Sequence, residues 1–309
     1  MDKRYIGGSD GLAVSLVGLG CNAFGGRVDE KGTRAVVDAA IDAGIDFLDT
    51  AETYGGGDSE RFIGSALAGR RQKVVLATKF GFATSHVAGK SRGTPENIRA
   101  ALDRSLTKLR TDWIDLYQLH RPDPDTPIEE TLGALEAVAE EGKIRYYGCS
   151  YFSGAQMQQA VDTARRAGLR GFVTAQNEWN VLERSIEADL IPVCEACGIG
   201  LLPYYPIAKG LLTGKYRRGQ VPPAGSRLAG DPDLAAADFD RLERLATYAA
   251  EHGHDLLTLA VSWLAAQPSI ASIIAGGSRP GQMAANAAGV RWRMTRENLA
   301  EIDALLAGP

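Results

Sequence analysis

The chain has 309 residues, 45% of them hydrophobic and 23% charged, and a formal net charge of -4 at pH 7. This composition is typical of a globular protein and argues against a disordered, fibrous or coiled-coil chain, while the length permits one α/β barrel or two smaller units. The slightly acidic balance gives no reason to expect nucleic-acid binding, so small molecules are the expected partners, and the sequence leaves the oligomeric state open.

The four cysteines point to no special chemistry. Cys194 and Cys197 form a C-x-x-C spacing, but they lie in a helix-like segment with no second cysteine pair or nearby histidine. We therefore expect neither a metal site nor a redox pair. Few cysteines and an N-terminus without an apolar stretch predict a protein of the reducing cytoplasm, and no apolar run is long enough to predict a membrane partner.

The chain is predicted to begin with a β-hairpin. Two short arms between Lys3 and Gly18 flank a turn made of Ser9, Asp10 and Gly11, a combination that favours antiparallel pairing. We expect this hairpin to cap the bottom of the domain that follows.

Eight short apolar runs then alternate with stretches of helical period, which is the pattern of repeated βα units. Thr33, Thr94 and Ser153 are candidate helix caps, and Gly44 and Gly168 fall where a left-handed residue would end a helix. The predicted strands are 15–20, 46–50, 74–79, 114–120, 144–150, 172–178, 199–205 and 271–277. Eight such units favour a single (β/α)₈ TIM barrel over residues 1–309 rather than a doubly wound sheet, which usually has fewer strands and an edge.

One connection is longer than a βα unit needs. Residues 214–233 are rich in glycine and proline and interrupt the seventh unit. Because long loops in compact domains are often functional, we expect this segment to be a lid.

Four ionisable residues fall at or just after the carboxyl ends of consecutive predicted strands, where TIM barrels carry their chemistry. They are Asp49, Tyr54, Lys79 and His120. A tyrosine exchanges protons near neutrality only if its phenolate is stabilised, which Lys79 could do while Asp49 pairs with that lysine. His120 could then hydrogen-bond a substrate carbonyl. A structural Asp49–Lys79 ion pair, with Tyr54 and His120 as packing residues, is the alternative.

The segments around these residues, "GLGCNAFGG", "FLDTAETYGGGDSE", "TKFG" and "DLYQLHRPD", resemble the signature segments of the aldo-keto reductase family, in the same order and over nearly the whole chain. The resemblance implies an NAD(P)H-dependent oxidoreductase that reduces aldehydes or ketones to alcohols, or the reverse. Tyr54 would be its general acid, Asp49 and Lys79 would tune that acid, and His120 would position the carbonyl.

The cofactor is expected in the barrel mouth, because no G-x-G-x-x-G segment joins a strand to a helix. Ser150 and Gln176 could hydrogen-bond a carboxamide, and the glycines, serine and arginine before Pro280 could form an anion site at a helix start. The resemblance also implies that Tyr204 stacks on the nicotinamide and that the segment after it covers the pyrophosphate. The expected contacts are Gly20, Ser150, Gln176, Tyr204, Pro206, Ile207, Lys209, Leu211, Lys215, Gly276, Ser278, Arg279, Gln282 and Asn286.

The chain departs from the family pattern at two positions. Tyr151 stands where many members have asparagine, which removes one expected hydrogen bond to the carboxamide, and Gly276 stands where several have lysine. Arg279 favours NADP(H), and NAD(H) remains the alternative.

An aromatic rim is expected around the substrate, formed by Asn22, Phe24, Phe80, Phe82, Tyr151, Trp179 and Tyr205. It does not select among sugars, steroid-like ketones and aromatic aldehydes. Two other functions fit parts of the pattern. The same family includes cofactor-binding subunits that act mainly as partners of channels, and a barrel lyase or isomerase could use Lys79 to form a Schiff base.

Overall fold

The computed structural model describes residues 1–9, 11–82 and 87–307, so Asp10 of the predicted turn lies outside them. The described residues contain an eight-stranded sheet in which every neighbouring pair of strands is parallel. Its strands, in the order in which they pair, are β10 (Ile273–Gly276), β3 (Val17–Gly20), β4 (Phe47–Asp49), β5 (Val75–Phe80), β6 (Ile114–Leu119), β7 (Ile144–Ser150), β8 (Thr174–Gln176) and β9 (Gly200–Leu201).

Backbone hydrogen bonds between the β9 segment and the start of β10 close the sheet into a barrel. Leu201 donates to the Ser269 carbonyl at 2.8 Å, and Ile274 donates to the Pro203 carbonyl at 2.9 Å. Strand β9 is shorter than predicted, and Pro203 within the predicted span has no N–H to donate to a ladder. The predicted (β/α)₈ barrel is confirmed.

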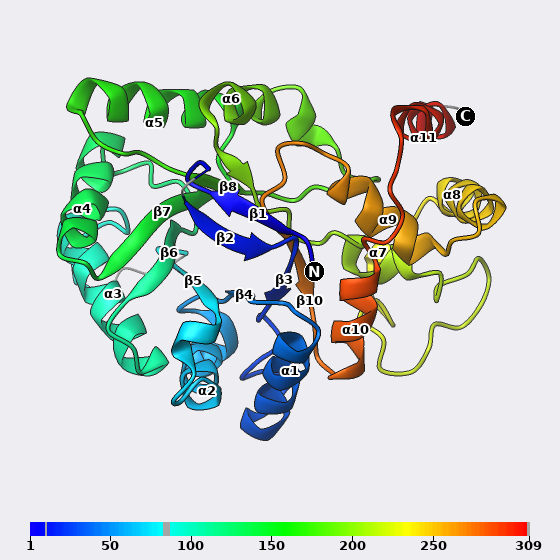
Figure 1. Cartoon of the computed structure of the whole chain (residues 1–309), viewed down its shortest axis with the longest axis horizontal. Helices are drawn as coiled ribbons and strands as arrows, with labels where there is room; N and C mark the ends of the chain where they lie inside the picture. The colour runs from blue at the N-terminus through cyan, green and yellow to red at the C-terminus, as the bar shows by residue number, and fades with distance from the viewer. Residues whose placement is uncertain (10, 83–86, 308–309) are drawn as a thin grey trace.

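Helices surround the barrel on its outer side (Figure 1). They are α1 (Glu30–Asp42), α2 (Asp58–Ala66), α3 (Pro95–Leu109), α4 (Ile128–Glu140), α5 (Gly154–Ala167), α6 (Leu190–Cys197), α7 (Pro232–Ala235), α8 (Phe239–Glu251), α9 (Leu256–Ala265), α10 (Gly281–Ala288) and α11 (Arg296–Ala307). None of the helices in the described part of the chain combines the length and the apolar character that crossing a bilayer requires.

The predicted helix boundaries were partly wrong. Ser153 caps α5 through a reciprocal pair of hydrogen bonds with Gln156, as predicted. Asp29, not Thr33, caps α1, because its carboxylate accepts from the Gly32 N–H while Thr33 is buried inside the helix. Thr94 precedes α3 but makes no side-chain capping bond, since its hydroxyl donates to the Ser91 carbonyl instead.

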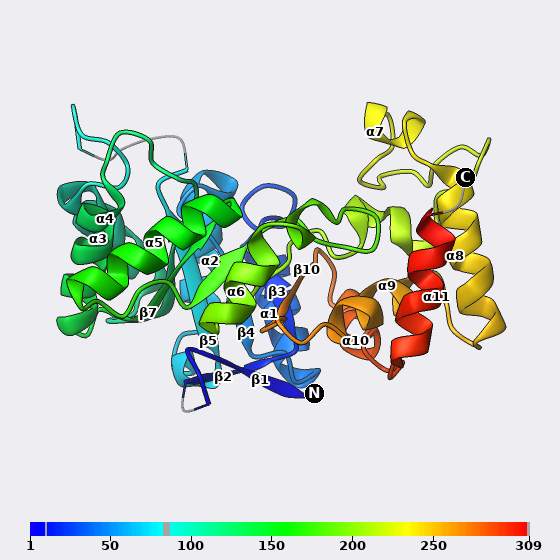
Figure 2. The ribbon, with the colours of Figure 1, turned by 90° about the horizontal axis from the view of Figure 1, so that it is seen from above.

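The predicted hairpin closes the amino end of the barrel. Strands β1 (Lys3–Ile6) and β2 (Leu12–Ser15) pair antiparallel. Their buried residues Ile6 and Val14 join a second core cluster with barrel residues such as Phe47 and Leu116. Figure 2 shows the hairpin at one end of the barrel and the segment before α7 at the other.

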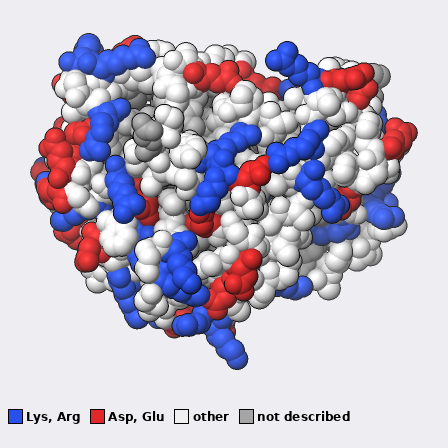
Figure 3. Space-filling view, in the orientation of Figure 1, with Lys and Arg blue, Asp and Glu red and all other residues white. Residues whose placement is uncertain are grey.

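The face that carries the hairpin shows no large region of one charge. Lysine and arginine side chains alternate with aspartate and glutamate across it (Figure 3). Single-sign surfaces attract oppositely charged partners, and this face has no such character.

Candidate active site

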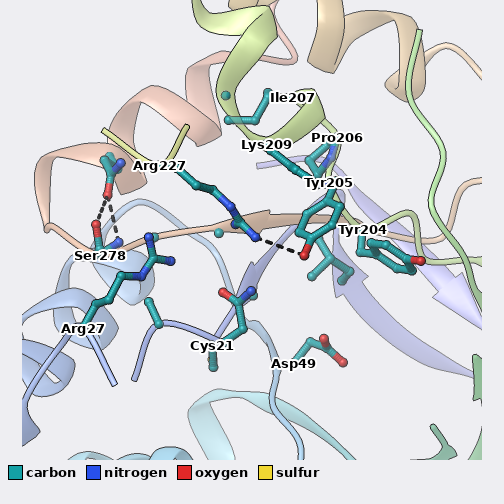
Figure 4. A pocket seen from close by; sticks show the side chains of 18 of the residues that line it. Cys21, Arg27, Asp49, Tyr204, Tyr205, Pro206, Ile207, Lys209, Arg227 and Ser278 are labelled. Atoms are coloured by element: carbon teal, nitrogen blue, oxygen red, sulfur yellow. Dashed lines mark hydrogen bonds between the residues drawn. The ribbon is translucent and has the colours of Figure 1, made fainter. Parts of the chain in front are cut away.

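A pocket of about 440 Å³ opens where the strands end at their carboxyl side (Figure 4). Most of the predicted site residues line it, and they come from both halves of the chain. These are Gly20, Asn22, Asp49, Tyr54, His120, Ser150, Tyr151, Gln176, Tyr204, Tyr205, Pro206, Ile207, Lys209, Lys215, Gly276, Ser278, Arg279 and Gln282.

Three successive glycines hold Tyr54 in position. The short 3-10 turn Tyr54–Gly57 has positive φ at Gly55, Gly56 and Gly57, a region that glycine enters without penalty. A side chain on Gly55 would also place its Cβ 2.4 Å from the carbonyl oxygen of Phe24. The "YGGG" segment is therefore a backbone requirement for the loop that carries the tyrosine.

Lys79 lies behind Tyr54 and is completely buried. Its Nζ donates to Asp49 Oδ2 at 2.7 Å, to the Thr50 carbonyl at 2.8 Å and to the Tyr54 hydroxyl at 3.4 Å. These contacts match the three donors of an ammonium group. Burial alone would lower the pKa of Lys79, but Asp49 and Tyr54 together raise it, so the lysine stays charged.

Asp49 is the centre of a buried network. Its second oxygen, Oδ1, accepts from Gln176 Nε2 at 3.2 Å and from Gln118 Nε2 at 3.3 Å. Both carboxylate oxygens are thus hydrogen-bonded, as a buried charge requires. Gln176, predicted to contact a carboxamide, donates to Asp49 and also fixes Ser150, whose hydroxyl donates to its carbonyl at 2.6 Å.

Two opposing effects act on the pKa of the Tyr54 hydroxyl, namely burial and the Lys79 charge that was expected to favour the phenolate. Burial raises the pKa of the Tyr54 hydroxyl above its usual value, and the opposing effect of the Lys79 ammonium does not offset it. Desolvation penalises the charged phenolate more than one neighbouring cation stabilises it. The hydroxyl is therefore protonated at neutral pH.

His120 faces Tyr54 edge-on, with ring centroids 5.9 Å apart. Burial, followed by the Lys79 and Arg121 charges, lowers the pKa of His120 to about 2. The imidazole is neutral at pH 7 and can donate one hydrogen bond without adding a positive charge. Within the described ranges, its Nδ1 has no hydrogen-bond partner although it is buried.

Tyr151 and Tyr204 form a tilted aromatic pair with centroids 5.4 Å apart. Tyr151 has φ +62°, a left-handed conformation that is unfavourable for a side-chain-bearing residue. Its backbone N–H donates to the Gln176 carbonyl at 3.2 Å. The residue that replaces the family's asparagine thus packs its ring beside the predicted stacking residue.

The predicted lid segment contributes a wall of the pocket. Residues 223–227 line it, and Arg227 donates to the Tyr205 hydroxyl at 3.0 Å (Figure 4). Lys209, predicted to contact a pyrophosphate, also forms an ion pair with Asp233. Leu211 is partly buried against the core and does not line the pocket.

A side chain of α10 binds the backbone of the loop that precedes this helix. Gln282 Oε1 accepts from the backbone N–H of Ser278 at 2.8 Å and of Arg279 at 3.0 Å. These are the donors predicted to hold a phosphate. Asn286 lies outside the pocket lining and donates to the Gly276 carbonyl at 3.3 Å, where it supports the end of β10.

Part of the predicted aromatic rim lies elsewhere. Phe24 and Phe80 are completely buried, Trp179 is 2% exposed, and all three belong to the main core. Trp179 packs against Trp263 and donates to Glu187, which ties it to the structure behind the pocket. Phe82 does not line the pocket, but its ring lies 4.8 Å from that of His120.

Two arginines that the sequence reasoning missed line the pocket, Arg27 and Arg227. Arg27 follows a glycine pair after β3 and lies beside Ser278 (Figure 4). The glycine pair after a strand was the available signal, since such loops bring backbone close to ligands. The described residues of the lining include the cations Arg27, Lys209, Lys215, Arg227 and Arg279 and one carboxylate, Asp49.

Comparison with known proteins agrees with this arrangement. The model of the aldo/keto reductase family matches residues 16–307. The chain is 34% identical over 306 residues to a probable aldo-keto reductase 1 of Glycine max, covering 96% of this chain and 86% of that protein. It is 34% identical to the aldo-keto reductase YhdN of Bacillus subtilis, covering 96% of this chain and 91% of that protein.

A third relative carries a different name. A probable voltage-gated potassium channel subunit beta of Oryza sativa subsp. japonica is 35% identical over 293 residues, covering 90% of this chain and 88% of that protein. Because the family model spans nearly all of the barrel and these relatives match over almost their full lengths, the chain belongs to the aldo/keto reductase family, a family of oxidoreductases.

Proposed function

We propose that the protein reduces an aldehyde or ketone to an alcohol with NADPH or NADH. The observation that carries the proposal is the Tyr54 hydroxyl, 3.4 Å from the Lys79 ammonium at the wall of a pocket whose other end is lined by cations. A proton donor and an anion-binding groove in one cavity are the two elements that reduction by a dinucleotide requires.

The residues of the pocket fit such a cofactor. Arg27, Lys215 and Arg279 can neutralise phosphates, and the backbone donors now bound to Gln282 Oε1 can bind a negatively charged oxygen. Tyr204 offers an aromatic face, and Ser150 and Gln176 offer polar groups near it. When bound, the nicotinamide supplies a hydride to the carbonyl carbon and is oxidised in exchange.

Tyr54 would donate its proton to the carbonyl oxygen, which becomes the alcohol hydroxyl, and solvent would later return that proton. The Lys79 ammonium would stabilise the phenolate that forms at that moment, while Asp49 holds the lysine in place. Neutral His120 would donate a hydrogen bond to the same oxygen and orient it. Because Tyr54 is protonated at neutral pH, it is in the form that can act as the acid in reduction.

A Schiff-base lyase is a weaker proposal. Lys79 has no exposed surface, and its three donors bind Asp49, Thr50 and Tyr54. Attack on a substrate carbonyl needs a neutral, accessible amine, and this lysine is held charged.

A regulatory subunit is the second candidate function, favoured by the name of the rice relative. Such a protein would bind the nucleotide with little turnover. Fluorescence titration with NADPH and NADH, followed by turnover of 4-nitrobenzaldehyde with the tighter cofactor, separates the two functions. Binding with turnover supports the reductase, binding without turnover supports the regulatory subunit, and no binding refutes both. We propose NADP(H) as the preferred cofactor, because the lining contains two arginines near the Ser278 end.

A further inference from the structure

We propose that Arg121 binds an anionic group of the carbonyl substrate, most simply a carboxylate, so that the preferred substrates are aldehyde acids or keto acids. The inference rests on the proposed reductase function and adds a substrate class to it. It comes from a partly buried arginine beside the pocket that has aromatic neighbours but, among the described residues, no ion pair.

Arg121 lies near the predicted reaction centre, with the Phe82 ring in contact with both Arg121 and His120. It follows His120 directly, after the end of β6. Its guanidinium carbon lies 4.7 Å from the centroid of Phe82 and 4.1 Å from that of Tyr151. The Phe82 ring in turn lies 4.8 Å from the His120 ring, and both His120 and Tyr151 line the pocket.

The two rings fix the guanidinium but leave its hydrogen-bonding edge unused. A cation attracted to ring faces gains electrostatic energy, yet its N–H donors still need acceptors. Over the ranges that the structure covers, the Arg121 side chain has no ion pair and no hydrogen bond. A planar guanidinium edge matches a carboxylate through two parallel hydrogen bonds.

Other arginines that lie over tryptophan rings show what is missing. Each has an aromatic neighbour and also a carboxylate partner within 3.0 Å: Arg71 with Asp115, Arg145 with Asp115, and Arg184 with Glu187. Arg121 has the aromatic neighbours, but no described residue supplies the carboxylate partner. A substrate carboxylate would supply the other half.

The backbone of Tyr151 adopts an unusual conformation where its ring contacts Arg121. Its left-handed conformation at φ +62° is unfavourable for tyrosine, yet the ring lies against Arg121 and also near Tyr204. Strain at a pocket residue is retained when the surroundings over-determine it. The ring therefore pre-orders the arginine before any substrate arrives.

The charges of the pocket would not oppose an anionic substrate. Asp49, the one carboxylate that the described residues bring to the lining, is bound to Lys79 and to two glutamine amides. These residues therefore present no unpaired negative charge to the substrate at the reacting end of the pocket.

The test compares 2-, 3- and 4-carboxybenzaldehyde with their methyl esters, using the holoenzyme and the tighter-binding cofactor. These pairs vary the separation of the carbonyl from the carboxylate and keep the ring constant. For at least one isomer we expect the acid-to-ester ratio of kcat/KM to be about tenfold or more, expressed mainly in KM, because hydrogen bonds to charged groups contribute on that scale. In Arg121→Gln the ratio should fall toward one, and Arg121→Lys should retain part of it.

Arg145→Gln is the matched control, since Arg145 also lies over an aromatic ring but is at the start of β7, at the other end of the barrel. It should keep the ratio of the parent protein. A structural role for Arg121 would lower activity toward acid and ester equally and leave the ratio intact, which overturns the inference. If the parent protein reduces the esters with the same kcat/KM as the acids, the inference about Arg121 is also overturned, while the reductase proposal stands. No reduction of any aldehyde overturns both.

Discussion

The Tyr54 hydroxyl lies 3.4 Å from the Lys79 ammonium, and yet the pKa of Tyr54 remains above its usual value. Burial is the main cause of this raised pKa, and the Asp49 carboxylate, 2.7 Å from the lysine, adds to it. This relationship gives the pocket a proton donor that keeps its proton until a reaction removes it.

Tyr54→Phe should lower kcat/KM for aldehyde reduction by about a thousandfold, because general acid catalysis contributes on the order of 10² to 10⁴. Cofactor affinity, measured by fluorescence titration, should stay within about twofold, since the ring is kept. Tyr5→Phe is the matched control, because Tyr5 is 55% exposed on the hairpin. Equal losses in both variants would exclude Tyr54 as the acid.

Lys79→Met should destabilise the fold as well as abolish activity. It leaves Asp49 buried with only two amide donors, and breaking a buried ion pair by removing one partner costs about 3–5 kcal/mol. The double variant Asp49→Asn with Lys79→Met should regain part of the unfolding free energy in urea titrations while remaining inactive. A single variant as stable as the parent protein would contradict the buried pair.

The pH dependence of stability should carry a signature of His120. Its pKa is about 2 in the folded protein and about 6.5 in the unfolded chain, so the unfolded state binds an extra proton between those values. Stability from this group is complete above about pH 6.5 and declines as the pH falls. His120→Gln should show a shallower decline between about pH 6.5 and 4 in denaturant titrations. Parallel curves for the two proteins would argue against a neutral, buried imidazole.

Gly55→Ala and Gly56→Ala separate the cost of backbone strain at positive φ from the cost of a steric clash of the added Cβ. Both glycines have positive φ, which costs alanine about 1–2 kcal/mol. A Cβ on Gly55 meets the Phe24 carbonyl at 2.4 Å, whereas Gly56 has open space around it. We expect Gly55→Ala to lose more unfolding free energy than Gly56→Ala, and to lose activity as the loop of Tyr54 shifts. Similar losses in both variants would mean that the loop absorbs the collision.

We propose that residues 214–233 act as a lid that Arg227 fastens to Tyr205. Arg227→Ala should raise the dissociation rate of the cofactor severalfold in stopped-flow fluorescence, since one hydrogen bond and one ring contact are lost. Arg217→Ala, in the same segment but outside the pocket lining, is the control. Unchanged dissociation in Arg227→Ala would remove the fastening role.

The barrel could be predicted from the alternation of strand and helix patterns, and the hairpin from its turn chemistry. The ends of the strands could also be predicted, which is why Asp49, Tyr54, Lys79 and His120 were expected close together. In the structure Lys79 contacts Asp49 and Tyr54, and His120 faces Tyr54. The aromatic rim was the weaker prediction. Phe24 and Trp179 are close to the site in sequence, but only packing determines that their rings turn toward the core.

The charge state of Tyr54 could not be predicted from residue types. The sequence places a cation beside the phenol, but the net direction of the pKa depends on how completely both groups are buried. Arg121 was likewise read only as part of a motif. That no described residue forms an ion pair with it becomes visible only in the structure, where the rings of Phe82 and Tyr151 lie beside it.

The side chain of Gln282 has a consequence for how tightly the α10 end of the pocket can hold an anion. Its oxygen already satisfies the amides of Ser278 and Arg279, so an incoming phosphate would exchange one acceptor for another. The count of hydrogen bonds would barely change, and the gain in affinity would come from charge attraction to Arg27 and Arg279. Nucleotide affinity should therefore weaken steeply as ionic strength rises. The weakening should be greater than at a site whose backbone N–H groups have no acceptor until the phosphate binds.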